Sequence, residues 1–159
     1  MRHTLSCLVK NATGVLARIV NGIAEDGINI HSVAVSETDD VDTSRMTLVV
    51  EGEKHTASRI YEHINGLPEV LELEELTAGE FISRQMMLVK VKAEGHTIAG
   101  VMQVAELTRA TVLDVGETTM TLELTGEEEQ MNAMIRMLKP YGILELARSG
   151  RIAVKHIHE

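Results

Sequence analysis

The chain has 159 residues, of which 44% are hydrophobic and 25% are charged, and its formal net charge at pH 7 is −9. The apolar fraction is large enough for a packed core in one domain or in two small ones. An acidic chain repels phosphate backbones, and one Phe and two Tyr offer little for base stacking, so we expect no nucleic-acid partner.

The sequence shows no sign of a membrane span or a leader. It contains no apolar run of about 18 residues, and Met1 to His3 leads directly into a strand pattern. The single cysteine, Cys7, cannot form an internal disulfide, and we expect it to be a small core residue in a reducing compartment, although a reactive thiol stays open. We therefore expect a cytoplasmic protein without membrane contact.

Apolar periodicity in the first half of the chain predicts the order β-α-β-β-α-β. The expected elements are a strand over 3–10, a helix over 16–23, strands over 28–35 and 46–50, a helix over 57–64 and a strand over 70–76. The strand over 28–35 changes its apolar parity between His31 and Ser32, which predicts a β-bulge there. We expect Val33 and Val35 to face away from the core, where a second subunit could contact them.

The same pattern begins again after a short polar break at 77–80. The expected elements are a strand over 87–91, a helix over 98–105, strands over 111–115 and 120–124, a helix over 131–138 and a closing strand over 143–154. Each half resembles the ferredoxin-like split βαβ arrangement, in which two helices cover one face of an antiparallel four-stranded sheet. We therefore predict an α+β protein of two such units, residues 1–78 and 79–159.

The stretch from Asn11 to Ile19 is the candidate ligand site, because a strand ends there and a helix begins. The first N–H groups of a helix lack intrahelical partners and lie at the positive end of its dipole, which favours a small anion. Gly14 lets a carboxylate approach the backbone, and the amide oxygen of Asn11 accepts a hydrogen bond from an ammonium group. A free α-amino acid carries both groups. Such turns also contain Asn, Thr and Gly for capping alone, with Thr13 as the N-cap.

Three other features stay open between a structural and a functional role. Asn29 is either a polar strand entrance or a residue that closes the site from a second subunit. Arg45 is either a turn residue with a paired side chain or an interface anchor. His156 and His158 alternate along a strand, but a chain end is poorly preorganised and two imidazoles do not complete a site, so we expect no metal.

Several cofactor and catalytic motifs are missing from the sequence. It contains no phosphate-binding loop with Lys-Ser/Thr, no dinucleotide fingerprint after a strand, no Cys-x-x-Cys and no His-Glu-x-x-His. These absences argue against an autonomous enzyme. An enzyme that used His31, Ser32 or Cys7 is an alternative, but the sequence supplies no set of nucleophile, base and orienting residue.

Several segments resemble one family, that of the regulatory small subunit of acetohydroxyacid synthase (acetolactate synthase). Residues 11–19 (NATGVLARI), 27–33 (GINIHSV) and 44–50 (SRMTLVV) resemble its ACT domain. Residues 84–91 (RQMMLVKV) and 146–150 (LARSG) resemble the entry and closing strands of its second domain. A generic ACT domain would match the first part alone, whereas this resemblance covers nearly the whole chain.

The resemblance implies a non-catalytic subunit that forms homodimers by side-by-side pairing of ACT domains. Such a subunit binds the catalytic large subunit, raises its activity and confers feedback inhibition by valine or a related branched-chain amino acid. Thiamine diphosphate, Mg²⁺ and FAD would belong to that larger partner, so we expect no cofactor in this chain. A free-standing tandem ACT-like amino-acid sensor for a different enzyme is the main alternative.

The resemblance also implies where the effector binds, namely between paired ACT domains. The implied effector-binding residues are Asn11, Ala12, Thr13, Gly14, Val15 and Leu16 of one subunit with Asn29 and Ile30 of the other. The apolar side chains expected around the branched side chain of the effector are those of Val15, Leu16, Ile30 and Val33.

Overall fold

The computed structural model describes residues 1–53 and 55–156 of the chain. The chain divides into two compact units, each with its own hydrophobic core. The first unit contains Met1–Ser83 together with Gly150–Glu159, and the second contains Arg84–Ser149. The domain boundary that we expect from the sequence, between residues 78 and 79, stays a prediction. Residues 150–156, which the sequence pattern assigns to the second unit, belong to the first.

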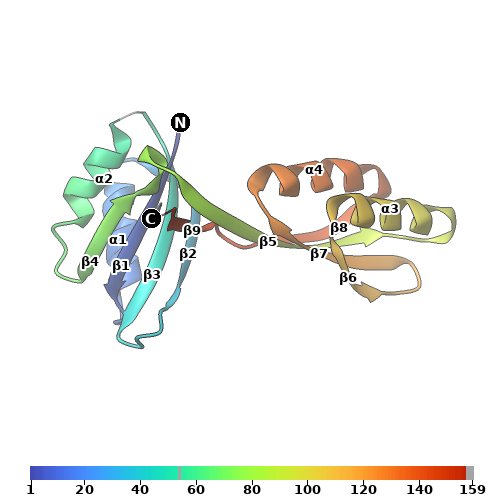
Figure 1. Ribbon diagram of the computed structural model, residues 1–159, viewed down its shortest axis with the longest axis horizontal. Coiled ribbons are helices and arrows are strands. Elements are labelled where there is room, and N and C mark those ends of the chain that lie inside the picture. Colours follow the sequence, from blue (N-terminus) through green and yellow to red (C-terminus); the bar gives the residue numbers. More distant parts are fainter. Residues whose placement is uncertain (54, 157–159) are drawn as a thin grey trace. The chain divides into compact units, whose positions relative to one another are not determined.

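The first unit is a two-layered β-α-β-β-α-β sandwich with sheet order β2-β3-β1-β4 (Figure 1). Its elements are β1 (Arg2–Lys10), α1 (Val15–Glu25), β2 (Asn29–Glu37), β3 (Thr43–Glu51), α2 (Thr56–Ile64) and β4 (Val70–Glu75). All neighbouring strands are antiparallel. Edge strands β2 and β4 therefore each have one side without a strand partner in this sheet.

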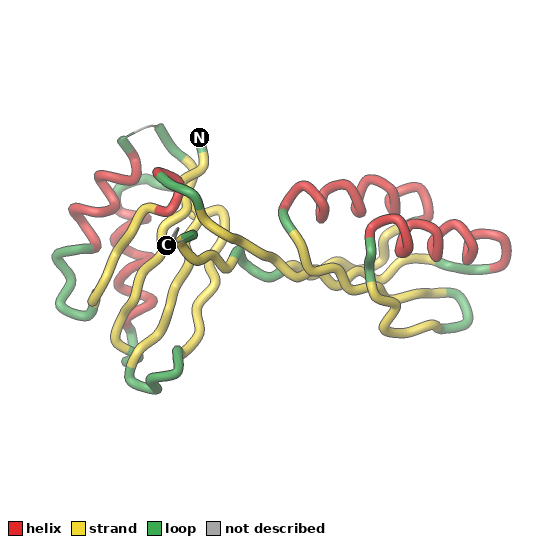
Figure 2. Tube along the Cα trace, viewed as in Figure 1, coloured by secondary structure: helices red, strands yellow, loops and turns green. Residues whose placement is uncertain are grey.

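Alternation along β1 explains how this unit builds its core. Leu5, Cys7 and Val9 are fully or almost fully buried and pack against apolar residues of α1 and α2. Strand residues point alternately to opposite faces, so Thr4 and Ser6 lie on the other face of the same strand. The two helices thus cover one face of the sheet (Figure 2).

The predicted bulge in β2 is confirmed, since the β2–β3 register shifts between Ile30 and Ser32. One consequence that we expect from it is wrong. Because the extra residue restores the parity of the strand, Val33 pairs opposite Leu48 and packs against the helix-covered core. Val35 is 43% exposed, so it alone of the two valines offers a substantial apolar surface at this edge.

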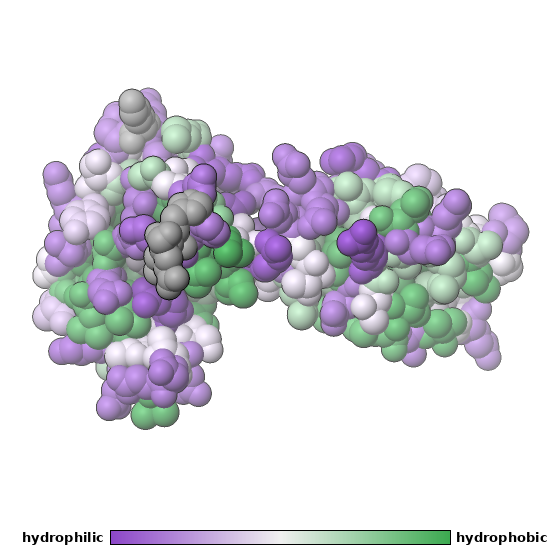
Figure 3. Space-filling view, viewed as in Figure 1, coloured by the Kyte–Doolittle hydropathy of each residue, from purple (hydrophilic) through white to green (hydrophobic). Residues whose placement is uncertain are grey.

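The second unit repeats the arrangement, with sheet order β6-β7-β5-β8. Its elements are β5 (Phe81–Lys92), α3 (Ile98–Thr108), β6 (Thr111–Val115), β7 (Thr119–Gly126), α4 (Glu128–Leu138) and β8 (Ile143–Arg148). Its core is rich in methionine, with Met87, Met120, Met131 and Met134 fully or almost fully buried. Apolar side chains also reach the surface of this unit, where Figure 3 shows green patches. Leu113 and Val115 of edge strand β6 are among the exposed apolar residues.

The closing strand expected over 143–154 is wrong as a single element. It consists of β8 (Ile143–Arg148) and β9 (Ile152–Lys155), separated by Ser149 to Arg151. Both β8 and β9 pair with β5, and β9 in addition contacts β1 and β3 of the first unit. Arg151 and β9 therefore lie over the face of the first sheet that α1 and α2 leave open. No helix among the described residues is long and apolar enough to cross a membrane.

Candidate functional site

The loop between β1 and α1 has the geometry of an open helix N-terminus. Gly14 is the N-cap, with φ 85° and ψ −6°, and no side chain caps the helix. The first turn of α1 contains no acidic residue. The expectation that Thr13 caps the helix is therefore wrong. Left-handed backbone at Gly14 is a conformation that glycine adopts without strain, and the uncapped turn suits an external anion.

Asn11 is oriented by the neighbouring β2–β3 hairpin loop. Its side-chain nitrogen donates to the carbonyl oxygen of Val41 at 2.8 Å, and its backbone N–H donates to the carbonyl of Asp42 at 2.7 Å. With the amide nitrogen engaged in this way, the amide oxygen is the side of Asn11 available to an ammonium donor. The acidic hairpin, interpreted from sequence as a solvated loop, thus contributes two backbone contacts to the site.

Arg18 is a feature of the site that we did not predict from the sequence. Its guanidinium Nη1 lies 3.4 Å from the position that a Cβ atom on Gly14 would occupy, and its Nη2 is paired with Glu69 at 2.6 Å. Glu69 offsets much of this positive charge, and what Arg18 offers an anion at the loop is the N–H donor on Nη1, which faces Gly14. The spacing of four residues between Gly14 and Arg18 was the signal available in the sequence.

The remaining loop residues differ in what they offer a ligand. Ala12, Thr13 and Leu16 are exposed, with Leu16 at 41%. Val15 is buried at 3% exposure and its N–H donates to the carbonyl of Ala12 at 3.3 Å. Val15 therefore supports the loop from the core, in contrast to the expectation that its side chain surrounds the effector.

Asn29 and Ile30 lie at the opposite end of the same sheet. Lys10, which precedes the loop, pairs with Thr43, whereas Asn29 pairs with Glu51 at the other end of β3. Eight residues of strand separate these two ends, which corresponds to roughly 26 Å at about 3.3 Å per residue. Within one chain the structure therefore brings together the residues from Asn11 to Leu16, and it keeps Asn29 and Ile30 apart from them.

The residues of the enzymatic alternative are not brought together either. Cys7 is fully buried in the helix-covered core, and burial raises the pKa of its thiol from 9.0 to about 12, opposed by the positive charge of Arg45. The hydroxyl of Ser32 accepts a hydrogen bond from the N–H of Arg151 at 2.9 Å. Ser32 pairs opposite Val49 on the helix-free side of the sheet, so it does not share a site with Cys7. A buried, protonated thiol is unreactive.

The two other open features have structural partners. Arg45 lies 3.6 Å from Glu72 and donates to the Ser6 hydroxyl at 3.5 Å. His156 lies 3.9 Å from Glu80, and His158 is outside the described residues. Among residues 1–53 and 55–156, no group of three His, Cys, Asp or Glu side chains could hold a metal ion.

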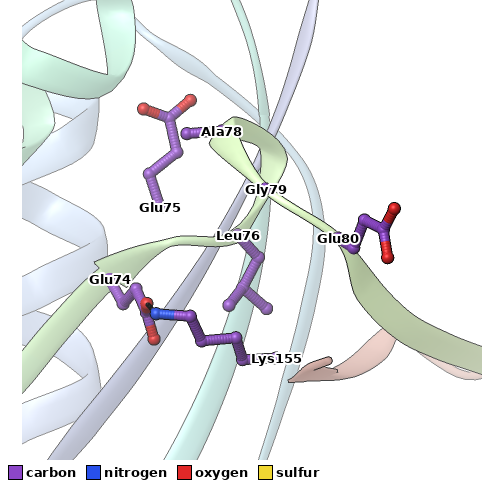
Figure 4. Close-up of a pocket in the computed structure, with 7 residues that line it drawn as sticks. All are labelled: Glu74, Glu75, Leu76, Ala78, Gly79, Glu80 and Lys155. Atoms are coloured by element: carbon purple, nitrogen blue, oxygen red, sulfur yellow. Dashed lines mark hydrogen bonds and ion pairs between the residues drawn. The ribbon is translucent and has the colours of Figure 1, made fainter. Parts of the chain in front are cut away.

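A separate hollow of about 190 Å³ lies where β4 ends and β5 begins (Figure 4). It is lined by Glu74, Glu75, Leu76, Ala78, Gly79, Glu80 and Lys155. Its ammonium group, that of Lys155, is already paired with Glu74. None of the residues expected to bind an effector lines this hollow.

Family models match both halves of the chain. The model described as the AHAS small subunit-like ACT domain matches residues 5–72. The model described as the small subunit of acetolactate synthase matches residues 84–157. Together the two models account for most of both compact units.

Relatives and a solved structure agree with these matches. An acetolactate synthase small subunit of Mycolicibacterium smegmatis is 40% identical over 152 residues, covering 96% of this chain and 89% of the relative. A probable acetolactate synthase small subunit of Archaeoglobus fulgidus is 35% identical and covers 97% and 96%. The crystal structure of the small subunit from Thermotoga maritima superimposes with a TM-score of 0.91 at 28% identity, covering 100% of this chain and 99% of that one.

Proposed function

The chain belongs to the acetolactate synthase small-subunit family, and on this premise we propose that it regulates a catalytic large subunit in response to a branched-chain amino acid. In this proposal the chain binds the large subunit and raises its activity. Valine or a related amino acid then inhibits the assembled enzyme through the first unit. In the same proposal the chain contributes no catalytic residue, and thiamine diphosphate, Mg²⁺ and FAD would belong to the large subunit.

The observation that carries the proposal is the separation of the two half-sites within one chain. Asn11 and Gly14 lie at the end of the sheet where β2 finishes, and Asn29 lies where β2 begins. Edge strand β2 can pair with β2 of a second chain. Antiparallel pairing about a two-fold axis would bring the partner's Asn29 to the end of the sheet that carries Asn11 and Gly14. Each dimer would then hold two equivalent, complete sites.

The chemistry of the two half-sites suits an α-amino acid. The uncapped N-terminus of α1 and the guanidinium of Arg18 favour its carboxylate. The amide oxygens of Asn11 and of Asn29 from the other chain accept hydrogen bonds from its ammonium group. Leu16 supplies exposed apolar surface for a branched side chain, and Ile30, which is partly buried against the helix-covered core, adds its accessible part. Because a complete set of partners needs both chains, neither half binds the amino acid well alone.

Inhibition would follow from a change in populations. Because two subunits complete the binding site, the effector binds only the arrangement in which the half-sites meet. It therefore increases the population of that arrangement. The large subunit would be less active in that arrangement. The effector can shift the equilibrium between the two arrangements only to the extent that it binds one of them more tightly than the other.

The test uses the purified full chain and a cognate catalytic subunit. We expect co-purification of the two, faster pyruvate condensation in the mixture than with the catalytic subunit alone, and inhibition by at least one of valine, leucine and isoleucine. Calorimetry on the chain alone should show one amino acid bound per subunit. Amino-acid binding without association with the large subunit would instead indicate a sensor for a different enzyme, and absence of both would contradict the proposal.

A further inference from the structure

We infer that Arg151 holds the bulge of β2 in place and thereby positions Asn29 and Ile30 for the effector. This inference rests on the proposed function, because it assigns a positioning role at the amino-acid site. It assigns a role at this site to a segment that follows the second unit in sequence. We refer to residues 150–156 as the C-terminal strap.

Arg151 bridges a row of residues across three strands of the first sheet. Thr4 of β1 pairs opposite Val49 of β3, and Val49 pairs opposite Ser32 of β2. The backbone N–H of Arg151 donates to the Ser32 hydroxyl at 2.9 Å, and its guanidinium Nη1 donates to the Thr4 hydroxyl at 3.1 Å. Val49 lies between these two anchors and is 1% exposed. Arg151 therefore ties the edge strand to the central strand β1.

At Gly150 the strap lies close to the backbone of β2. A Cβ atom on Gly150 would lie 2.3 Å from the carbonyl oxygen of Val33 and 3.0 Å from the nitrogen of Ala34. Both are backbone atoms of the strand immediately after the bulge. Since backbone cannot move aside as a flexible side chain does, any larger residue at 150 would displace β2 or the strap.

The far end of the strap is also fixed within the first unit. Lys155 is hydrogen-bonded to Glu74 of β4, as Figure 4 shows, and the N–H of His156 donates to the carbonyl of Glu80 at 2.9 Å. Two of its anchors, on β2 and on β4, are therefore on the two opposite edge strands. The strap is therefore held at both ends, by Arg151 at the bulge and by Lys155 and His156 at the far side of the sheet.

The bulge is where this restraint matters for the site. The register shifts between Ile30 and Ser32, directly after Asn29 and Ile30. Within a single chain, β2 is hydrogen-bonded on one side only, to β3. The register of such a strand can slip at an extra residue before the dimer forms, and a slip of one residue turns every preceding side chain to the other face. By fixing Ser32, Arg151 selects the register in which Asn29 and Ile30 keep their present orientation.

The first test is hydrogen exchange of the full-length wild-type chain with and without 10 mM valine, leucine or isoleucine, chosen as probes. The amide of Arg151 reports on its own bond to Ser32. We expect the bound amino acid to slow exchange at residues 29–34 and, in the same titration, at residue 151. Protection of 29–34 with no change at 151 would overturn the inference while leaving the proposed function intact. No protection anywhere would count against the proposed function itself.

The second test compares substitutions in the full chain by calorimetry. Ser32→Ala removes the acceptor for Arg151 and should weaken amino-acid binding about three- to tenfold. Ser32→Thr keeps the hydroxyl and should restore binding. Ser58→Ala, on the exposed side of α2 and away from β2, is the matched control and should leave the dissociation constant unchanged. Equal binding by all three variants and the wild type would overturn the positioning role.

Alanine substitutions at two glycines distinguish loss of the contact between strap and β2 from general destabilisation of the fold. Gly150→Ala should weaken binding by at least as much as Ser32→Ala. Gly79→Ala is its control, since a Cβ there meets no atom within 4 Å. Melting curves identify any variant that fails to fold, in which case the wild-type exchange experiment decides the inference alone.

Discussion

At the residue scale, Gly14 combines two constraints in one position. Its φ of 85° is a conformation that costs most L-residues about 1–2 kcal/mol. Its missing side chain leaves space beside the guanidinium of Arg18, 3.4 Å from where a Cβ atom would lie. If this turn served only to cap the helix, a charged and an uncharged side chain of the same shape at position 14 would have the same effect on inhibition. Charge is therefore the property that separates a ligand site from a cap.

Gly14→Asp should abolish the proposed feedback inhibition, because its carboxylate would lie beside Arg18, where our proposal places the carboxylate of the effector. Gly14→Asn is the matched control, since it has the same shape and backbone strain without the charge, and Asn tolerates this conformation well. We expect the inhibitor concentration for half-inhibition to rise at least about tenfold more for Asp than for Asn. Pyruvate-condensation assays with each variant measure this. Equal effects of the two substitutions would indicate a capping role alone.

Asn11 and Asn29 allow a test of whether each site is shared between two chains. An unmet hydrogen bond to a buried ammonium group costs roughly 1.5–3 kcal/mol, or about ten- to a hundredfold in affinity. A heterodimer of an Asn11→Ala chain with an Asn29→Ala chain should keep one intact site and lose both partners at the other. Calorimetry on the mixed dimer should show one site of near-wild-type affinity. Two equally weakened sites would mean that each pocket lies within one chain.

Cys7 should be unreactive in the folded protein and should make stability depend on alkaline pH. Its folded pKa of about 12 exceeds the value of 9.0 in the unfolded chain, so the unfolded chain loses the thiol proton first as pH rises. The free energy of unfolding should therefore decrease from about pH 9 upward, and it should decrease less in Cys7→Ala. Denaturant titrations at pH 8 and pH 10 measure the difference. Rapid reaction of the native thiol with a disulfide reagent at pH 8 would contradict its burial.

At the scale of elements, β2 is the strand on which the proposed dimer depends. It is an edge strand, and the helix-covered core uses Val33 but leaves Val35 43% exposed. The opposite edge strand, β4, exposes Leu71 to a similar extent, 47%. Val35 and Leu71 are therefore comparable exposed apolar residues on opposite edges of the sheet, and only Val35 lies in the proposed dimer interface.

Val35→Asp should convert the dimer to a monomer, because it would place a carboxylate on each of the two paired strands, inside the proposed interface. Leu71→Asp should leave the dimer intact. Both positions are exposed in the single chain, so we expect each substitution to change its stability by no more than about 0.5 kcal/mol. Light scattering after size-exclusion chromatography distinguishes the outcomes. Dimers in both variants would place the interface elsewhere, for example at the exposed edge of β6.

At the scale of the whole molecule, the chain leaves the first unit after Ser83 and returns to it at Gly150. The returning strap covers part of the helix-free face of the first sheet, including Val49 and Thr4, each 1% exposed. The first unit is thus complete only with residues from both ends of the chain. A division of the chain at one point separates the strap from the sheet that it covers.

A fragment of residues 1–83 should fold and dimerise but melt at a lower temperature than the same fragment joined to residues 150–156 by a Gly/Ser linker. Uncovering Val49 and its neighbours costs about 1–2 kcal/mol, which corresponds to a melting temperature lower by about 5–10 °C for a domain of this size. Circular dichroism at micromolar concentration measures both fragments. Equal melting temperatures would show that the strap adds no stability, and an unfolded linked fragment would contradict the two-unit architecture.

The sequence alone determined most of the elements, the bulge in β2 and the loop at Asn11 to Gly14. These features are local: periods of two and of about 3.6 residues, parity changes and turn residues express themselves within a few positions. The family resemblance added the expected effector residues, and the family itself is now shown by the matches to both halves.

Only the tertiary structure decided which elements cover one another. The alternation of β2 indicates that Val33 is part of an apolar face, but it does not say what covers that face, because packing partners are set by contacts far apart in sequence. The strap therefore looked like the end of the second unit, although Arg151 binds Ser32, 119 residues earlier in the chain. The separation of Asn29 from Asn11 follows in the same way from strand order. Periodicity within a strand does not indicate the order of strands in the sheet, because strands pair through contacts between residues that are far apart in sequence.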